Sequence, residues 1–149
     1  MDPGGFADQA ALHAFYAAFY PRRLQPALFE AATALRPRYQ VALVTNAWTG
    51  QREHIAELTG RPVESLFDAY VNSAEVGARK PAPAIFHVAL ERLGVQPTEA
   101  IFLDDLPVNV AAAAALGIRA ILVETPDAAL RALAAALGHP LTPSAPAAG

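Results

Sequence analysis

Short apolar runs alternate with helical patterns along most of this chain, and that alternation limits its fold more than any other feature. The runs cover residues 41–44, 69–71, 100–103 and 119–123. Their residues are mainly apolar at consecutive positions, which is typical of strands that are covered on both faces. We therefore expect an α/β fold with a mostly parallel sheet between two layers of helices.

Proline and glycine mark the ends of the helices that we expect between these runs. Pro83 and Pro107 suit the first position of two helices, and Gly94 and Gly117 follow their last apolar residues. Further helices are predicted around Ile55, and from Thr125-Pro126 to Gly138. A sheet covered in this way predicts a Rossmann-like three-layer α/β/α architecture.

The first third of the chain also reads as helical. Asp8 can cap a first helix that ends at Pro21, and Pro26 can open a second helix that ends at Arg36-Pro37. The apolar face of the first helix would consist of Leu12, Phe15, Tyr16 and Phe19. At the other end, residues 139–149 are rich in proline and alanine without periodicity, which predicts a disordered tail.

Composition excludes several classes of function. The chain has 149 residues, enough for one domain, and a net charge of −3 with scattered basic residues, so neither nucleic acid nor a membrane surface is an expected partner. There is no cysteine, which removes disulfides and thiolate metal sites. No apolar run is long enough to span a membrane, and residues 1–5 do not resemble a signal peptide. We expect a cytoplasmic protein.

Polar residues follow three of the predicted strands. Thr45 and Asn46 follow the first strand, Asn72-Ser73 follows the second with Lys80 a little further on, and Asp104-Asp105 follows the third. Parallel sheets place their chemistry beyond the carboxyl ends of their strands, so these side chains should gather at one edge. Asp104-Asp105 could also simply cap the next helix, and Lys80 could be a solvated loop residue.

This set of groups suits phosphoryl transfer. Adjacent carboxylates suit Mg²⁺, which takes few protein oxygens and keeps several waters. A lysine ammonium can neutralise a phosphate, and a threonine hydroxyl with the following backbone N–H groups can bind phosphate oxygens. Positioning and charge neutralisation supply most of the catalysis in such sites.

Three segments, in this order and at this spacing, resemble motifs of the haloacid dehalogenase-type (HAD) hydrolases. Residues 41–46 resemble the second motif, an apolar strand ending in threonine or serine. Residues 77–86 resemble the third, in which a lysine precedes a proline and a helix. Residues 101–117 resemble the fourth, and their acidic pair is closer to the phosphatases of the family than to its metal-free dehalogenases.

The resemblance implies a role for each matching residue. Thr45 would bind phosphate with the Asn46 backbone, and the catalytic Lys80 would neutralise the nucleophile and the phosphate. Asp104 would ligate Mg²⁺ directly, while Asp105 would hold a metal-bound water or Lys80. Trp48 follows Thr45-Asn46 and either contacts a substrate or covers the edge of the sheet.

The chain departs from the family before Thr45. The family begins with an apolar strand followed by Asp-x-Asp, whose aspartates act as nucleophile and as general acid and base, and only Asp2 and Asp8 precede Thr45 here. We therefore expect residues 1–24 to be a residual helical cap segment, 25–138 an incomplete core and 139–149 the tail. Without the nucleophile strand, the strands ending at Thr45 and Asp104 should pair directly, or the domain should be poorly stable.

These observations predict a core derived from a Mg²⁺-dependent phosphatase that acts on a small phosphorylated metabolite, impaired or inactive without the Asp-x-Asp motif. The alternative is a non-catalytic, truncated domain that retains phosphate or metal binding or serves in association. Its partner would be a small phosphorylated molecule, together with a second copy of the chain or a separately supplied N-terminal segment. A phosphate-receiver domain is excluded by the order of the motifs, and a dinucleotide-binding domain by the lack of Gly-x-Gly-x-x-Gly after a strand.

Overall fold

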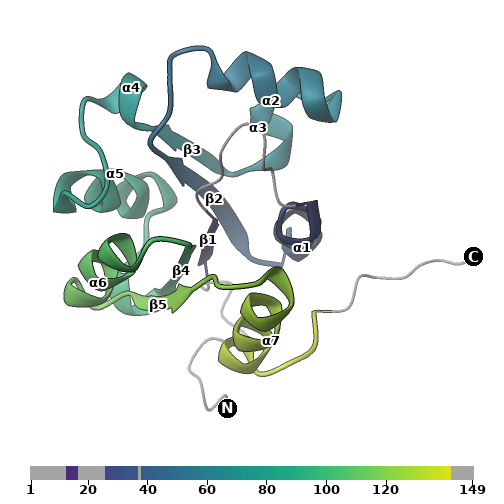
Figure 1. Ribbon diagram of the computed structural model, residues 1–149, viewed down its shortest axis with the longest axis vertical. Helices are drawn as coiled ribbons and strands as arrows, with labels where there is room; N and C mark the ends of the chain where they lie inside the picture. Colours follow the sequence, from purple (N-terminus) through teal and green to yellow (C-terminus); the bar gives the residue numbers. More distant parts are fainter. Residues whose placement is uncertain (1–12, 17–25, 37, 142–149) are drawn as a thin grey trace, which may run out of the picture.

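Five parallel strands form one sheet at the centre of the protein. The computed structural model describes residues 13–16, 26–36 and 38–141 (Figure 1). The strands lie in the order β3-β2-β1-β4-β5, and each pairs in parallel with its neighbours. Their bounds are β1 (His13–Tyr16), β2 (Gln40–Thr45), β3 (Ala69–Asn72), β4 (Ala100–Asp104) and β5 (Arg119–Leu122). The predicted α/β class is confirmed, as are the four strands that the apolar runs predicted.

Helices cover both faces of this sheet (Figure 1). On one face α1 and α7 lie side by side, and α5 and α6 cover the other face, so the layers are α/β/α. The helices are α1 (Pro26–Leu35), α2 (Gln51–Thr59), α3 (Val63–Leu66), α4 (Ser73–Val76), α5 (Pro83–Leu93), the 3-10 helix η2 (Pro97–Glu99), α6 (Pro107–Ala115) and α7 (Pro126–Leu137). Among these helices, none has both the length and the apolar character needed to cross a lipid bilayer.

The alternation of side chains along the strands divides the core into two halves. Val41 and Leu43 in β2 pack in the half that contains α1 and α7, whereas Ala42 and Val44 pack in the half that contains α5 and α6. All four side chains are fully buried. Burial on both faces explains why this strand reads as a continuous apolar run in the sequence.

The expected helix boundaries recur in the structure. Pro83, Pro107 and Pro126 open α5, α6 and α7 in the first turn, where a missing N–H leaves no hydrogen bond unmade. Gly94 follows α5 with φ 70°, a left-handed conformation that favours glycine because it has no Cβ. Thr125 caps α7, since its hydroxyl accepts a hydrogen bond from Ala128 N.

The middle strand of the sheet corrects two predictions. His13–Tyr16 forms β1 between β2 and β4, with Tyr16 beside Leu43 on one side and beside Leu103 on the other. The helix predicted over this segment is therefore wrong at these four residues. The expectation that no strand lies between β2 and β4, so that they pair directly or leave the domain poorly stable, is wrong as well, because the chain itself completes a five-stranded sheet.

Backbone hydrogen bonding explains this outcome. A short apolar stretch is compatible with either a helix or a buried strand, and periodicity alone does not separate them. Between β2 and β4, however, only a strand satisfies the backbone groups of both neighbours, and each unpaired buried group costs about 1–3 kcal/mol. Tertiary pairing thus overrides the local helical pattern.

The expected cap and tail are only partly within the described residues. Residues 1–12, 17–25 and 142–149 lie outside them, so the boundaries predicted at 24 and 139 stay predictions. β1 is nevertheless part of the core sheet and not of a separate cap. His139, expected at the start of the tail, contacts the core: its Nε2 lies 2.7 Å from the Tyr39 hydroxyl, and the two rings stack.

Candidate functional site

Three of the predicted site residues meet at the carboxyl edge of the sheet. Thr45 ends β2, Asp104 ends β4, and Lys80 reaches the same edge from the loop between α4 and α5. Thr45 and Asp104 are each 1% exposed and Lys80 is 5% exposed. Charged groups are rarely buried to this extent unless they are paired. The partners of Lys80 and Asp104 therefore determine which ligands the site can bind.

The Lys80 ammonium is held by two acceptors. Its Nζ donates to Asp104 Oδ2 at 2.7 Å and to the Val44 carbonyl at 3.0 Å. An ammonium has three N–H donors, and the described residues provide no acceptor for the third. Nζ also lies 5.7 Å from the centre of the Phe102 ring, and one N–H of this buried cation is without an oxygen acceptor in the described part of the chain.

Asn46 fixes the backbone at Lys80. Its side-chain Nδ2 donates to the Lys80 carbonyl at 3.0 Å, and its Oδ1 accepts from Lys80 N at 2.8 Å. The sequence suggested a contribution from the Asn46 backbone to phosphate binding, which stays a prediction. The side-chain clamp was not expected, because it joins residues 34 positions apart that no sequence pattern connects.

Asp104 is oriented by donors on both carboxylate oxygens. Oδ1 accepts from Leu106 N at 2.9 Å, while Oδ2 accepts from Lys80 and from Asn109 Nδ2 at 3.1 Å. Asn109 is itself buried, at the start of α6. Its amide thus helps to orient the Asp104 carboxylate.

The electrostatics of the site leave an excess of negative charge. Burial lowers the pKa of Lys80, and the Asp104 carboxylate acts against that shift. Partial burial and the neighbouring Asp104 raise the pKa of Asp105, whose side chain is exposed at the mouth of the site. Two carboxylates thus share one ammonium, an arrangement that a cation would relieve.

The acidic pair fits a hard divalent cation. Within residues 13–16, 26–36 and 38–141, no cluster of three or more histidine, aspartate or glutamate side chains is placed to hold a metal. Mg²⁺ does not need one, since it is commonly held by one or two carboxylates with waters and substrate phosphate completing the shell. Asp104 Oδ1 accepts a hydrogen bond from a backbone N–H and none from the Lys80 ammonium, and Asp105 is accessible.

Gln51 contributes to the site and was missed at the level of sequence. Its Nε2 donates to Thr45 Oγ1 at 3.2 Å, and its side chain is 1% exposed although it stands in the first turn of α2. A glutamine is rarely buried so completely, but nothing in the printed sequence distinguishes Gln51 from a surface residue of a helix.

Exposed apolar side chains lie close in sequence to the site residues. Trp48, in the loop after β2, is 43% exposed, and its ring lies 5.7 Å from the His54 ring. Leu106 and Val108, which follow the acidic pair, are also exposed. A contact between Trp48 and a substrate stays a prediction.

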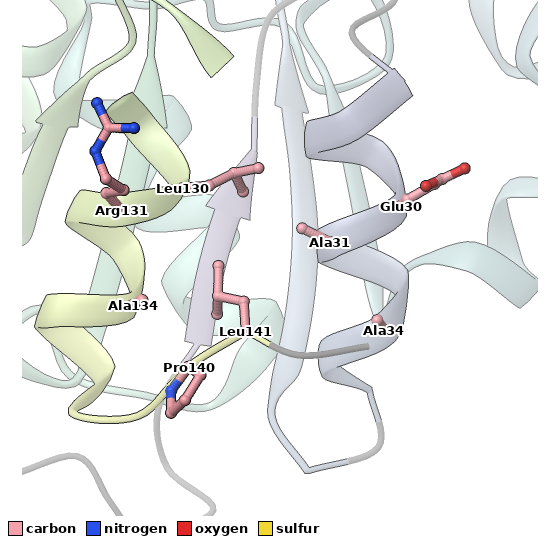
Figure 2. Close-up of a pocket in the computed structure, with 8 residues that line it drawn as sticks. All are labelled: Glu30, Ala31, Ala34, Leu130, Arg131, Ala134, Pro140 and Leu141. Carbon is pink, nitrogen blue, oxygen red and sulfur yellow. The ribbon is translucent and has the colours of Figure 1, made fainter. Parts of the chain in front are cut away.

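A separate pocket of about 510 Å³ lies between α1 and α7 and shares no residue with this site. Figure 2 shows its mainly apolar lining, with Ala31 and Ala34 on one helix and Leu130 and Ala134 on the other. Glu30 and Arg131 point outward, away from each other. Glu30 and Arg131 are the charged residues of this lining, and its other members are alanine, leucine and proline.

Comparison with known proteins shows which family the chain is similar to. A family model for haloacid dehalogenase-like hydrolases matches residues 5–117. The chain is 32% identical over 140 residues to bifunctional epoxide hydrolase 2 of Sus scrofa, covering 90% of this chain and 25% of that protein. It is 35% identical over 130 residues to phosphoserine phosphatase of Thermus thermophilus, covering 83% and 51%. The chain thus spans about half or less of these relatives' lengths.

Solved structures show the same fold. An uncharacterised protein from Corynebacterium glutamicum matches with a TM-score of 0.68 over 86% of this chain and 94% of that chain, at 20% identity, a likeness of fold alone. A HAD family enzyme from Bacteroides thetaiotaomicron, in complex with magnesium and inorganic phosphate, matches with a TM-score of 0.59 at 27% identity, over 66% of this chain and 52% of that chain.

Proposed function

This chain belongs to the haloacid dehalogenase-like hydrolase family, and we propose that its sheet edge binds a small phosphorylated metabolite together with Mg²⁺. The observation that carries this proposal is the buried Lys80–Asp104 pair, 2.7 Å apart at the sheet edge where β2 also ends in Thr45. One ammonium hydrogen remains for an anion and the acidic pair remains for a cation. A phosphate ester with its magnesium ion supplies both.

Each group would have a distinct task. Lys80 and Thr45 would bind phosphoryl oxygens, and Asp104 and Asp105 would hold the ion. When bound, Mg²⁺ supplies positive charge that stabilises the transferring phosphoryl group. Asn46 and Asn109 would keep the lysine and the aspartate in place, because their amides clamp the Lys80 backbone and the Asp104 carboxylate. Trp48 is the candidate on the loop after β2 for contact with the rest of the substrate.

The comparisons support a phosphate ester as the ligand class. One relative carries the name phosphoserine phosphatase, and one similar structure holds magnesium with inorganic phosphate. The paired carboxylates after β4 agree with this class, since a dication and a phosphate need acidic groups and a lysine at the same edge. We propose the same class for this chain.

We further propose that hydrolysis by this chain is impaired. The family's reaction, as the resemblance implies it, uses an Asp-x-Asp after the strand that lies between β2 and β4. Here β1 holds that position, and in the sequence that follows it the two positions of an Asp-x-Asp are Ala17 and Phe19. Neither alanine nor phenylalanine provides a nucleophile or a general acid or base. The alternative is a purely non-catalytic domain that binds phosphate and metal.

Measurements of turnover and of phosphate binding test the proposed site and the proposed impairment of hydrolysis. The purified chain would be assayed for Mg²⁺-dependent hydrolysis of an aryl phosphate, with Asp104→Asn as control, and binding of inorganic phosphate would be measured by calorimetry. We expect phosphate binding that depends on Asp104 and Lys80, with little or no turnover. Turnover that Asp104→Asn abolishes would refute the impairment, and no phosphate binding at any Mg²⁺ concentration would refute the site.

A further inference from the structure

A line of buried hydrogen bonds runs from β3 to the Thr45 hydroxyl. Asn72 Nδ2 donates to the Tyr70 hydroxyl at 2.9 Å, and that hydroxyl donates to Gln51 Oε1 at 2.8 Å. Gln51 Nε2 then donates to Thr45 Oγ1 at 3.2 Å. Every member of this line is buried. Its four side chains come from β3, α2 and β2.

The backbone sets the direction of this line. Asn72 Oδ1 accepts from Ala74 N at 2.9 Å, and Asn72 Nδ2 also donates to the Trp48 carbonyl at 3.0 Å. A backbone N–H can only donate and a carbonyl can only accept, so the orientation of the Asn72 amide is determined by its neighbours. Its Nδ2 must therefore be the donor to Tyr70.

The remaining orientations follow one from another. Because Tyr70 accepts from Asn72, its single hydrogen points to Gln51 Oε1. The other end of the Gln51 amide is then Nε2, which has hydrogens and no acceptor capacity. Thr45 Oγ1 must accept this hydrogen bond, so the hydroxyl hydrogen of Thr45 has to point elsewhere. Among the described residues, no acceptor for that hydrogen is found.

From this geometry we propose that Gln51 is a positioning residue, which keeps the Thr45 hydroxyl as a hydrogen-bond donor to the phosphate group of the ligand. The inference rests on the proposed function. A hydroxyl is ordinarily free to donate or accept, and here the amide occupies its acceptor side before the ligand arrives. Phosphate oxygens only accept, so a hydroxyl prepared to donate binds them without reorienting.

The surroundings keep the line in one arrangement. The Arg52 guanidinium lies 4.6 Å from the centre of the Tyr70 ring, and Glu64 and Glu75 hold it there by ion pairs of 2.6 and 2.8 Å. Burial raises the pKa of Tyr70 to about 12, so its hydroxyl keeps the hydrogen that it donates to Gln51. The line is therefore neutral and directional at physiological pH.

A double-mutant cycle tests the proposal. The dissociation constant of inorganic phosphate with saturating Mg²⁺ would be measured by calorimetry for the wild type, Gln51→Met, Thr45→Val and the double variant. We expect Thr45→Val to weaken phosphate binding by about tenfold or more, since a hydrogen bond to a charged group is lost. Gln51→Met should weaken binding severalfold in the wild-type background and have no effect in the Thr45→Val background.

A second variant guards against loss of folding. Gln51→Met leaves the Tyr70 hydroxyl without its acceptor, whereas Gln51→Glu keeps that acceptor and replaces the donor to Thr45 by another acceptor. Urea unfolding would confirm that each variant is folded. We expect Gln51→Glu to weaken phosphate binding at least as much as Gln51→Met, because the Thr45 hydrogen would turn toward the carboxylate.

The possible outcomes separate this inference from the function on which it rests. If Gln51→Met weakens binding equally with and without the Thr45 hydroxyl, Gln51 does not act through Thr45 and the inference fails. If both Gln51 variants bind phosphate as tightly as the wild type, it fails as well. If the folded wild type binds no phosphate, the proposed function itself fails and the inference fails with it.

Discussion

The Nζ of Lys80 lies 2.7 Å from Oδ2 of Asp104, and the two side chains are 3% and 1% exposed. Neither group can be removed alone without leaving its partner as a buried, uncompensated charge. The cost of such a loss is about 3–5 kcal/mol, whereas replacing both members of a buried pair with apolar groups is often close to neutral. Stability measurements therefore report directly on this pair.

We expect Lys80→Met to lower the free energy of unfolding by about 3–5 kcal/mol, because the Asp104 carboxylate would lose its counter-charge. The double variant Lys80→Met/Asp104→Leu should recover most of that loss. Urea unfolding at pH 7 measures both changes. Additive losses of stability in the double variant would show that the two groups do not interact as described. Arg131→Met, at an exposed position of α7, is the control for loss of a cation outside the pair.

We expect Mg²⁺ to raise the unfolding midpoint of the wild type, since an ion that binds only the folded chain stabilises it by mass action. Asp104→Asn should abolish this rise. A thermal-unfolding series against Mg²⁺ concentration gives the measurement, and Asp127→Asn, in the first turn of α7, is a matched control that should respond like the wild type. A rise that persists in Asp104→Asn would place the ion elsewhere.

The raised pKa of Asp105 gives a prediction with a definite sign. The pKa of Asp105 is higher in the folded chain than its usual value near 3.8. The free energy of unfolding therefore falls as pH rises from the usual pKa to the raised pKa, and this loss of stability remains at higher pH. Without Mg²⁺, Asp105→Asn should therefore be slightly more stable than the wild type at pH 7. The two should converge below the usual pKa. Urea unfolding at pH 7 and pH 3.5 checks this, and an equal difference at both pH values would contradict it.

Tyr70 should be distinguishable among the four tyrosines of the chain. Burial raises the pKa of its phenol to about 12, whereas an unfolded tyrosine titrates near 10. The unfolded state therefore loses this proton first, and the stability linked to Tyr70 is complete below pH 10 and falls as pH rises toward 12. Ultraviolet titration of the wild type and Tyr70→Phe isolates this group. A Tyr70 that titrates near 10 would contradict the buried network.

The central position of β1 makes a further prediction. Because β1 pairs with both β2 and β4, a proline at Ala14 removes a backbone donor in the middle of the sheet. We expect Ala14→Pro to lower the free energy of unfolding by about 3 kcal/mol or more. Ala14→Val keeps the donor, suits a strand and should have a much smaller effect. Equal effects of the two substitutions would indicate that this segment is not a paired strand.

The features that the sequence predicted correctly are those that depend on residues close together in the chain. The strands ending at Thr45 and Asp104 could be predicted because burial on both faces makes the strand sequence itself apolar. Lys80 could be assigned to the same edge because its motif stands in a fixed order with the other two. These features are local in sequence.

The parts that could not be predicted depend on partners distant in the chain. The segment that forms β1 has a pattern compatible with a helix, and its two neighbouring strands lie 27 and 87 positions further along. The contacts of Gln51 with Thr45 and Tyr70, and of Asn46 with Lys80, exist only once the strand order is known. Sequence patterns do not carry the geometry of such side-chain pairs.

A crystal structure of the chain with Mg²⁺ and inorganic phosphate would show whether the sheet edge binds both. We expect a phosphate oxygen within hydrogen-bonding distance of both Lys80 Nζ and Thr45 Oγ1, and a metal ion on Asp104 beside it. Clear density for phosphate at another surface, with the sheet edge unchanged and filled by water alone, would show that this edge is not the phosphate site.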